Sequence, residues 1–170
     1  QAAELEKGVL TQCIKADTVE KKANDSTLNN ILLKLNSKLN GINQRIDAGS
    51  KTSIFSSDKS VMLIGADVTH PSPTQRNIPS IVGTCATSDP DCVRYNMQFR
   101  IQDPKKEIIV SMKDVVLEHL KIFFNDQKKY PSHIIYYRDG VADGQFEQVL
   151  NEELAKGMNL AFGEFRELIV

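Results

Sequence analysis

The sequence predicts an α/β fold in which a mixed sheet with flanking helices follows a short helical region. Three observations predict this fold. Leucine and isoleucine recur at helical spacing near the start of the chain, strand-like apolar runs begin at Val61, and an amphipathic helix separates the last two runs. Of the 170 residues, 41% are hydrophobic and 25% are charged, which is typical of a globular chain with a core.

The first predicted helix follows Ser26 or Thr27, either of which can act as its N-cap. Gly41 stands where the end of a helix favours a residue that tolerates positive φ. The apolar side chains at helical spacing between these two ends are Leu28, Ile31, Leu32, Leu35 and Leu39.

A segment without periodicity, residues 47–60, divides the chain. It is rich in Ser, Lys and Gly, so we predict a linker between one unit at residues 1–46 and another at residues 61–170. The second unit opens with a near-continuous apolar run at residues 61–67. That pattern is typical of a central strand that is covered on both faces.

Two further strands and a long helix are predicted next. Residues 80–86 are a weaker strand candidate. Residues 93–102 alternate apolar and polar side chains with a period of two, which predicts a strand with one face buried and one face in water. Asp103 and Pro104 suit the start of a helix, and an apolar stripe continues that helix to about Phe124.

A strand at residues 133–139 and a helix at about residues 145–156 complete the predicted order. Strand, strand, strand, helix, strand, helix is the order of ribonuclease H-like folds. Many α/β proteins share parts of that order, so it does not establish a function.

Two aspartates stand at strand ends, where burial disfavours an ionised group. Asp67 and Asp139 would each cost several kcal/mol there unless paired or bound to a cation. Divalent cations bind such oxygens, and two ions about 4 Å apart stabilise both the attacking water and the leaving oxygen in phosphodiester hydrolysis. Alternatively, each aspartate caps a turn or pairs with Arg138. The pattern alone leaves both interpretations open.

Two other polar residues have ordinary explanations. Glu107 falls in the first turn of the predicted long helix, where a contact with the helix dipole, of under ~1 kcal/mol, accounts for it. His70 precedes Pro71 and is interpreted as a turn residue rather than a metal ligand.

Two lysines one helical turn apart indicate a possible anion site. Lys34 and Lys38 share one edge of the first helix, and an anion such as phosphate would relieve their repulsion. Gln12 would add an amide donor. The spacing by itself favours a solvated helix edge over this site.

The composition constrains the cellular location of the protein more than it constrains any reaction that the protein catalyses. The net charge of −1 provides no bulk attraction to nucleic acid, so any such site must be a local patch. The 3 cysteines have no metal-ligand spacing, which favours a reducing compartment. No apolar run has the length of a membrane span and no signal pattern opens the chain. We therefore expect a cytoplasmic protein that makes no membrane contact.

Several segments resemble the Argonaute family. GADVTHPSP at residues 65–73 and YYRDGVADGQF at residues 136–146 look like the two signature segments of the PIWI domain of eukaryotic Argonautes. TQC at residues 11–13 and LKLNSKLNGIN at residues 33–43 resemble the part of the MID domain that binds a guide 5′ phosphate.

Two more segments extend the resemblance. DPKKEII at residues 103–109 resembles the family's glutamate-finger segment, and YNMQFRIQ at residues 95–102 resembles insect Argonautes of the small-interfering-RNA class. The matching segments occur in family order from Thr11 to Glu153.

The resemblance implies a role for each matching residue. Asp67, Glu107 and Asp139 correspond to the metal-binding catalytic carboxylates of the family, which would hold Mg²⁺ or Mn²⁺. The residues that correspond to ligands of the guide 5′ phosphate are Gln12, Lys34 and Lys38.

The implied fold is the C-terminal part of a MID domain at residues 1–46 and the N-terminal part of a ribonuclease H-like PIWI domain at residues 61–170. The parent protein would hold a small guide RNA and act as a Mg²⁺-dependent endonuclease on complementary target RNA, in RNA-mediated gene silencing with partner proteins. This chain alone would be inactive, because the family's final catalytic histidine would lie beyond Val170 and two phosphate ligands at or before Gln1. Residues 154–170 match the family poorly.

Two alternatives remain for the function. An Argonaute can silence by holding its target and recruiting partners without cutting it. A ribonuclease H-like nuclease can act without any guide.

Overall fold

A computed structural model of the chain describes residues 2–45, 55–56, 58–72, 74 and 78–167. The chain forms two compact units, a first unit at Gln1–Arg45 and a second unit at Ile46–Val170. The predicted linker at residues 47–60 lies largely outside the described residues, since residues 47–54 and 57 are not among them.

The first unit contains α1 (Ala2–Leu5), α2 (Ala16–Lys21) and α3 (Asp25–Lys38). The cap of α3 is Asn24, whose side-chain oxygen accepts a hydrogen bond of 2.9 Å from the backbone N–H of Thr27. The prediction of Ser26 or Thr27 as the cap was therefore wrong by two to three residues, because an asparagine earlier in the chain makes the same contact.

The end of α3 also differs from the prediction. Asn40, rather than Gly41, has positive φ, at 60°. The backbone N–H groups of Asn40 and Gly41 donate to the carbonyls of Ser37 and Asn36, which closes the last turn. A Cβ on Gly41 would stand 2.0 Å from Oδ1 of Asn36, so a larger residue there would have to displace that side chain.

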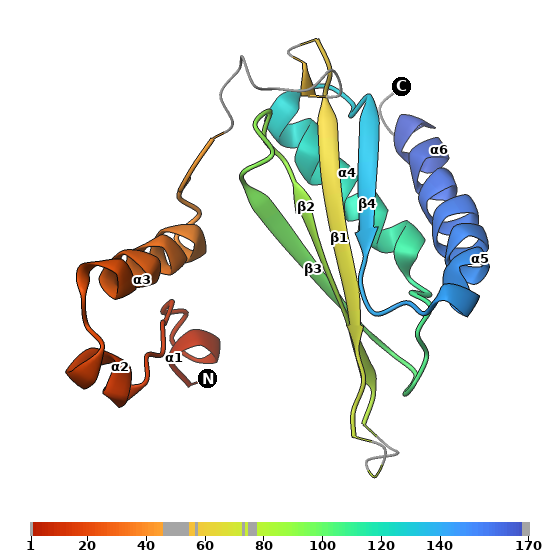
Figure 1. The fold of residues 1–170 in the computed structure, drawn as a ribbon. Coiled ribbons are helices and arrows are strands. Elements are labelled where there is room, and N and C mark those ends of the chain that lie inside the picture. Colours follow the sequence, from red (N-terminus) through yellow and green to blue (C-terminus); the bar gives the residue numbers. More distant parts are fainter. Residues whose placement is uncertain (1, 46–54, 57, 73, 75–77, 168–170) are drawn as a thin grey trace. The chain divides into compact units, whose positions relative to one another are not determined.

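The second unit is built on a four-stranded mixed sheet (Figure 1). Its strands are β1 (Val61–Thr69), β2 (Ser80–Thr87), β3 (Tyr95–Gln102) and β4 (His133–Arg138), in the order β3-β2-β1-β4. β1 pairs antiparallel with β2 and parallel with β4, and β2 pairs antiparallel with β3. This is the predicted meander followed by a crossover to a further strand, so the predicted mixed α/β fold is confirmed.

Helices follow the third and fourth strands. α4 (Met112–Gln127) connects β3 to β4. After β4 come a short 3₁₀ turn, η3 (Asp143–Gln145), and a continuous helical stretch made of α5 (Phe146–Gln148), the π-helical η4 (Val149–Met158) and α6 (Asn159–Glu167). The predicted last helix thus extends beyond residue 156, through the segment for which the sequence indicated no role.

The core of the second unit lies between the sheet and these helices. β1 and β2 contribute alternate side chains, and α4, η4 and α6 contribute the facing ones. Its main members are Met62, Ile64, Val82, Met112, Val116, Leu120, Phe123, Met158, Ala161 and Phe165. Burial along β1 alternates, and Asp67 is exposed. The expectation of a strand covered on both faces is therefore not met among the described residues.

The long helix begins later than predicted. α4 starts at Met112, whereas the sequence placed the start at Asp103 and Pro104. The side chain of Gln102 donates to the carbonyls of Lys106 and Ile108, so two backbone groups that a helix would use are bonded elsewhere. Glu107 consequently lies in a connecting segment, and the helix-dipole interpretation of this residue was wrong.

The strand β3 has the predicted period of two, but its faces are reversed relative to the usual pattern. Met97 and Phe99 are 73% and 64% exposed, while the polar side chains of Asn96 and Arg100, on the other face, contact α4. Arg100 forms an ion pair of 2.8 Å with Glu118 of that helix. A period of two identifies the two faces of a strand without showing which one is covered.

Candidate active site

The two strand-end aspartates lie at the same end of the sheet, on neighbouring strands. Ala66 pairs with Arg138 in the parallel ladder of β1 and β4, and the N–H of Asp139 donates to the carbonyl of Ala66 at 3.0 Å. Asp67 and Asp139 therefore follow directly after paired positions, and both are exposed. Their Oδ1 atoms each accept one backbone N–H at 2.8 Å, from Val68 and Gly140 respectively. The ladder thus fixes the backbone of both aspartates.

Glu107 reaches the same place from the segment before α4. A Cβ built on Gly140 would stand 3.3 Å from Oδ1 of Asp67 and 3.7 Å from Oε1 of Glu107. Carboxylates from two distant parts of the chain therefore converge on the residue that follows Asp139. Gly140 has φ of +76°, a conformation that favours glycine. The structure brings all three predicted carboxylates to one end of the sheet.

Three hydrogen bonds hold Glu107. Nη2 of Arg138 donates to Oε1 of Glu107 at 2.8 Å and to its backbone carbonyl at 2.6 Å. Nε2 of His70 lies 2.7 Å from Oε2, and Nδ1 of the same ring lies 2.8 Å from Oγ of Ser80. His70 does follow β1 as predicted, but both ring nitrogens have partners, which the turn interpretation did not include.

The charge of Glu107 is favoured by these contacts. Partial burial acts to raise the pKa of its carboxyl group, but the hydrogen bonds from His70 and Arg138 outweigh burial and lower the pKa below its ordinary value. Each carboxylate oxygen accepts one hydrogen bond from these side chains and retains a further lone pair. Glu107 is therefore an ionised oxygen donor beside Asp67.

A buried glutamate lies behind Arg138. Glu153 of η4 is 0% exposed and accepts hydrogen bonds from Nε of Arg138 at 3.3 Å, from the hydroxyl of Tyr136 at 2.6 Å and from the N–H of Ile109 at 2.9 Å. Residue types and spacing alone did not identify Glu153 as a functional residue. Its signal was a charged residue on the buried side of the last helical stretch, between Val149 and Met158.

The groups around Glu153 are in the protonation states that this contact requires. Burial, and then the contact with Glu153, raise the pKa of the Tyr136 hydroxyl, which stays a donor. Burial alone would lower the pKa of Arg138, but the hydrogen bond to Glu107 and the charge of Glu153 raise it above its ordinary value. The side chain of Arg138 is only 6% exposed, so this guanidinium is a buried cation between two carboxylates.

The donor set suits a hard divalent cation. Carboxylate oxygens are the ligands that Mg²⁺ and Mn²⁺ prefer. Across the described residues, no three His, Cys, Asp or Glu side chains stand close enough together to form a complete metal site. Asp67 and Asp139 would thus need to turn towards a bound ion, for which their exposure leaves room.

The predicted phosphate ligands all lie in the first unit. Nζ of Lys38 donates to the carbonyl of Thr11 at 2.6 Å, which brings this lysine to the segment that carries Gln12. Oε1 of Glu4 accepts from the N–H and the hydroxyl of Thr11, at 3.1 and 2.6 Å. Lys34 is exposed one turn before Lys38 on α3. Two of the three predicted residues, Gln12 and Lys38, are therefore neighbours in this unit.

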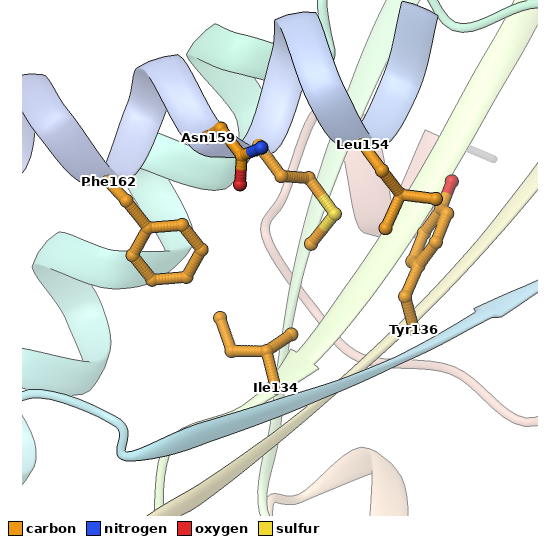
Figure 2. A pocket seen from close by; sticks show the side chains of 6 residues that line it. Ile134, Tyr136, Leu154, Asn159 and Phe162 are labelled. Atoms are coloured by element: carbon orange, nitrogen blue, oxygen red, sulfur yellow. The ribbon is translucent and has the colours of Figure 1, made fainter. Parts of the chain in front are cut away.

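A pocket lies between β4 and the last helices (Figure 2). It has a volume of about 330 Å³. Its lining residues are Ile134, Tyr136, Leu154, Met158, Asn159 and Phe162. No helix in the described part of the chain combines the length and the apolarity that crossing a membrane requires.

Comparison with known proteins places the chain in a family. The Piwi domain family model matches residues 1–167, so the chain belongs to the Piwi-domain family. Its curated relatives include the Drosophila melanogaster protein argonaute-2, which is 55% identical over 154 residues. That match covers 91% of this chain and 12% of the relative, so the chain spans about one eighth of that protein.

Solved Argonaute structures have the same fold. A crystal structure of Kluyveromyces polysporus Argonaute with a guide RNA superposes with a TM-score of 0.83 at 27% identity, over 96% of this chain and 19% of that one. The MID-PIWI domains of the N. crassa protein QDE-2 superpose with a TM-score of 0.71 at 26% identity, over 87% of this chain and 42% of that one. The resemblance to Argonautes is confirmed.

Proposed function

We propose that this chain is part of an Argonaute that binds the 5′ phosphate of a small guide RNA and cleaves complementary target RNA. The observation that carries the proposal is the approach of Asp67 and Glu107 to Gly140, directly after Asp139. Three carboxylates at one end of a sheet, in a chain of the Piwi-domain family, support a two-metal nuclease site.

The residues of the candidate active site would have different roles. Asp67 and Asp139 would supply ligand oxygens from backbones held by the β1–β4 ladder. Glu107, ionised and held by Arg138, would add a third carboxylate. Mg²⁺ or Mn²⁺, when bound, would supply an activated water and neutralise charge on the scissile phosphate. Gly140 leaves open the space between the carboxylates, because it has no Cβ.

The first unit would anchor the guide. A terminal phosphate carries nearly two negative charges, so several donors can bind it at once. Lys38 and Gln12 lie on neighbouring segments, and Lys34 extends the same helix edge. The choice of target would then be made by base pairing, and the protein would recognise backbone geometry rather than bases. The parent would act with other silencing-complex proteins in the cytoplasm.

A single-turnover assay tests the proposal. Full-length parent protein, loaded with a 5′-phosphorylated guide, is mixed with a perfectly paired target and Mg²⁺. We expect cleavage of the target, and we expect chelation of Mg²⁺ to stop it. Asp67→Ala should abolish cleavage. Asp126→Ala, at the exposed end of α4, is the matched control and should cleave normally.

Two results would support the alternatives. Tight target binding without cleavage would indicate an Argonaute that silences by recruiting partners. Cleavage that requires no guide would indicate another ribonuclease H-like nuclease.

A further inference from the structure

The strongest feature that the proposed function does not use is the buried carboxylate of Glu153. A fully buried ionised group is costly unless several donors compensate it. Glu153 has three donors, namely Arg138, Tyr136 and the backbone of Ile109. Arg138 and Tyr136 belong to β4, which directly precedes Asp139, and Ile109 belongs to the segment that carries Glu107. Glu153 therefore links the two parts of the chain that must stay together at the site.

We propose that Glu153 is a positioning residue for target cleavage, which acts through Arg138 to hold Glu107 beside Asp67. This inference rests on the proposed function. Nε of Arg138 donates to Glu153, and Nη2 of the same guanidinium donates to the carboxylate and to the carbonyl of Glu107. Because the guanidinium is planar and rigid, fixing Nε also fixes the direction in which Nη2 points.

The connection has a second branch through the backbone. Oε1 of Glu153 also accepts from the N–H of Ile109, two residues after Glu107. Ile109 is 1% exposed, so this part of the segment is anchored in the core. Glu153 thus holds the segment of Glu107 at both its side chain and its backbone. The ring of Tyr136 lines the pocket between β4 and the last helices (Figure 2). Its hydroxyl donates to the other oxygen of Glu153, Oε2, and keeps the carboxylate from turning away.

The test uses the full-length protein loaded with a guide and an uncleavable target. Mn²⁺ binding is measured by electron paramagnetic resonance, and cleavage of a normal target is measured separately. We expect Glu153→Gln to weaken Mn²⁺ binding and to slow single-turnover cleavage by roughly 10- to 100-fold, as is typical for residues that orient metal ligands. Guide loading and target affinity should stay unchanged, because a positioning role does not involve either.

Two further variants separate positioning from folding. Glu152→Gln is the matched control: Glu152 is exposed and pairs with Lys156 at 2.7 Å, so this variant should behave as wild type. Tyr136→Phe removes one donor without removing the charge, and should weaken Mn²⁺ binding and cleavage by a smaller, several-fold amount. If Glu153→Gln does not load a guide, Tyr136→Phe decides the question.

A double-mutant cycle tests whether Glu153 acts through Arg138. In the Arg138→Lys background, Glu153→Gln should add little further loss, because the guanidinium that it orients is already absent. Full additivity of the two losses would overturn the inference.

The outcomes distinguish this inference from the proposed function. If wild type neither binds Mn²⁺ nor cleaves, or if Asp67→Ala has no effect on either, the proposed function fails and the inference fails with it. If Asp67→Ala abolishes both while Glu153→Gln and Tyr136→Phe match wild type, only the role of Glu153 is overturned.

Discussion

Gly140 lies so close to Asp67 that a Cβ on the glycine would stand 3.3 Å from the carboxylate Oδ1 of the aspartate. The same Cβ would stand 3.7 Å from Oε1 of Glu107. The backbone φ of Gly140, +76°, is also one that other residues adopt only under strain. Gly140 therefore contributes both conformational freedom and open space to the candidate active site.

A methyl group at this position should disturb the site. We expect Gly140→Ala to lower the free energy of unfolding by about 1–2 kcal/mol, because of the left-handed backbone. Displacement of the carboxylates should slow cleavage by the guide-loaded parent by about 10- to 100-fold. Gly144→Ala is the control, since nothing lies within 4 Å of a Cβ there. Equal cleavage rates for the two variants would contradict the role of Gly140.

The lysine pair of α3 predicts how the guide is recognised. Hydrogen bonds to charged groups contribute about 1.5–3 kcal/mol each. Replacing Lys34 and Lys38 by alanine should therefore reduce the preference of the parent for 5′-phosphorylated over 5′-hydroxyl guide RNA by at least about tenfold. Filter binding with the two guides measures this ratio. Lys21→Ala with Lys22→Ala, on exposed positions of the same unit, should leave it unchanged. An unchanged ratio in the α3 variant would rule out this phosphate site.

The buried histidine of α4 predicts a pH dependence of stability. His119 is fully buried, with Nε2 at 2.9 Å from Oγ1 of Thr84, and burial lowers its pKa from 6.5 to about 4. Between these two pH values the unfolded chain binds more protons than the folded one, so the free energy of unfolding falls as the pH drops from 6.5 to 4. The total loss from His119 should be about 3 kcal/mol.

Urea unfolding at several pH values measures this contribution. Other groups also titrate in this range, so the relevant quantity is the difference between wild type and His119→Gln. That difference should shrink as the pH falls through the window. A difference that is independent of pH would contradict the prediction.

A close contact between helices predicts a packing defect. A Cβ on Gly157 would stand 2.7 Å from Cβ of Met112, the first residue of α4. Gly157→Ala should therefore lower the free energy of unfolding by about 1–3 kcal/mol. Gly163→Ala, in α6 where a Cβ meets nothing within 4 Å, should instead raise it by about 0.5–1 kcal/mol, since alanine favours a helix. Thermal unfolding of both variants checks the opposite signs.

Much of the fold could be predicted because it depends on local patterns. The apolar runs of β1 and β4 and the stripe of α4 determine which segments become strands or a helix, and their order indicates a mixed sheet. The three carboxylates were identified only by resemblance to a family, since residue types and spacing had left Asp67 and Asp139 open and had explained Glu107 as an ordinary helix-start residue.

What only the tertiary structure decided involves contacts between distant residues. The polar face of β3 is the covered one because Asn96 and Arg100 find partners on α4, which no period of two reveals. α4 begins at Met112, beyond the start expected at Asp103. Part of the reason is that the side chain of Gln102 donates hydrogen bonds to backbone carbonyls of the segment before α4.

The sequence by itself determined that carboxylates stand at the ends of two strands. The tertiary structure decided that Glu107 joins them, through an arginine that lies 31 residues away and is itself held by a glutamate of a later helix. The physical reason is that periodicity records which face of a segment is apolar, whereas the partner of a buried charge is set by how the segments pack.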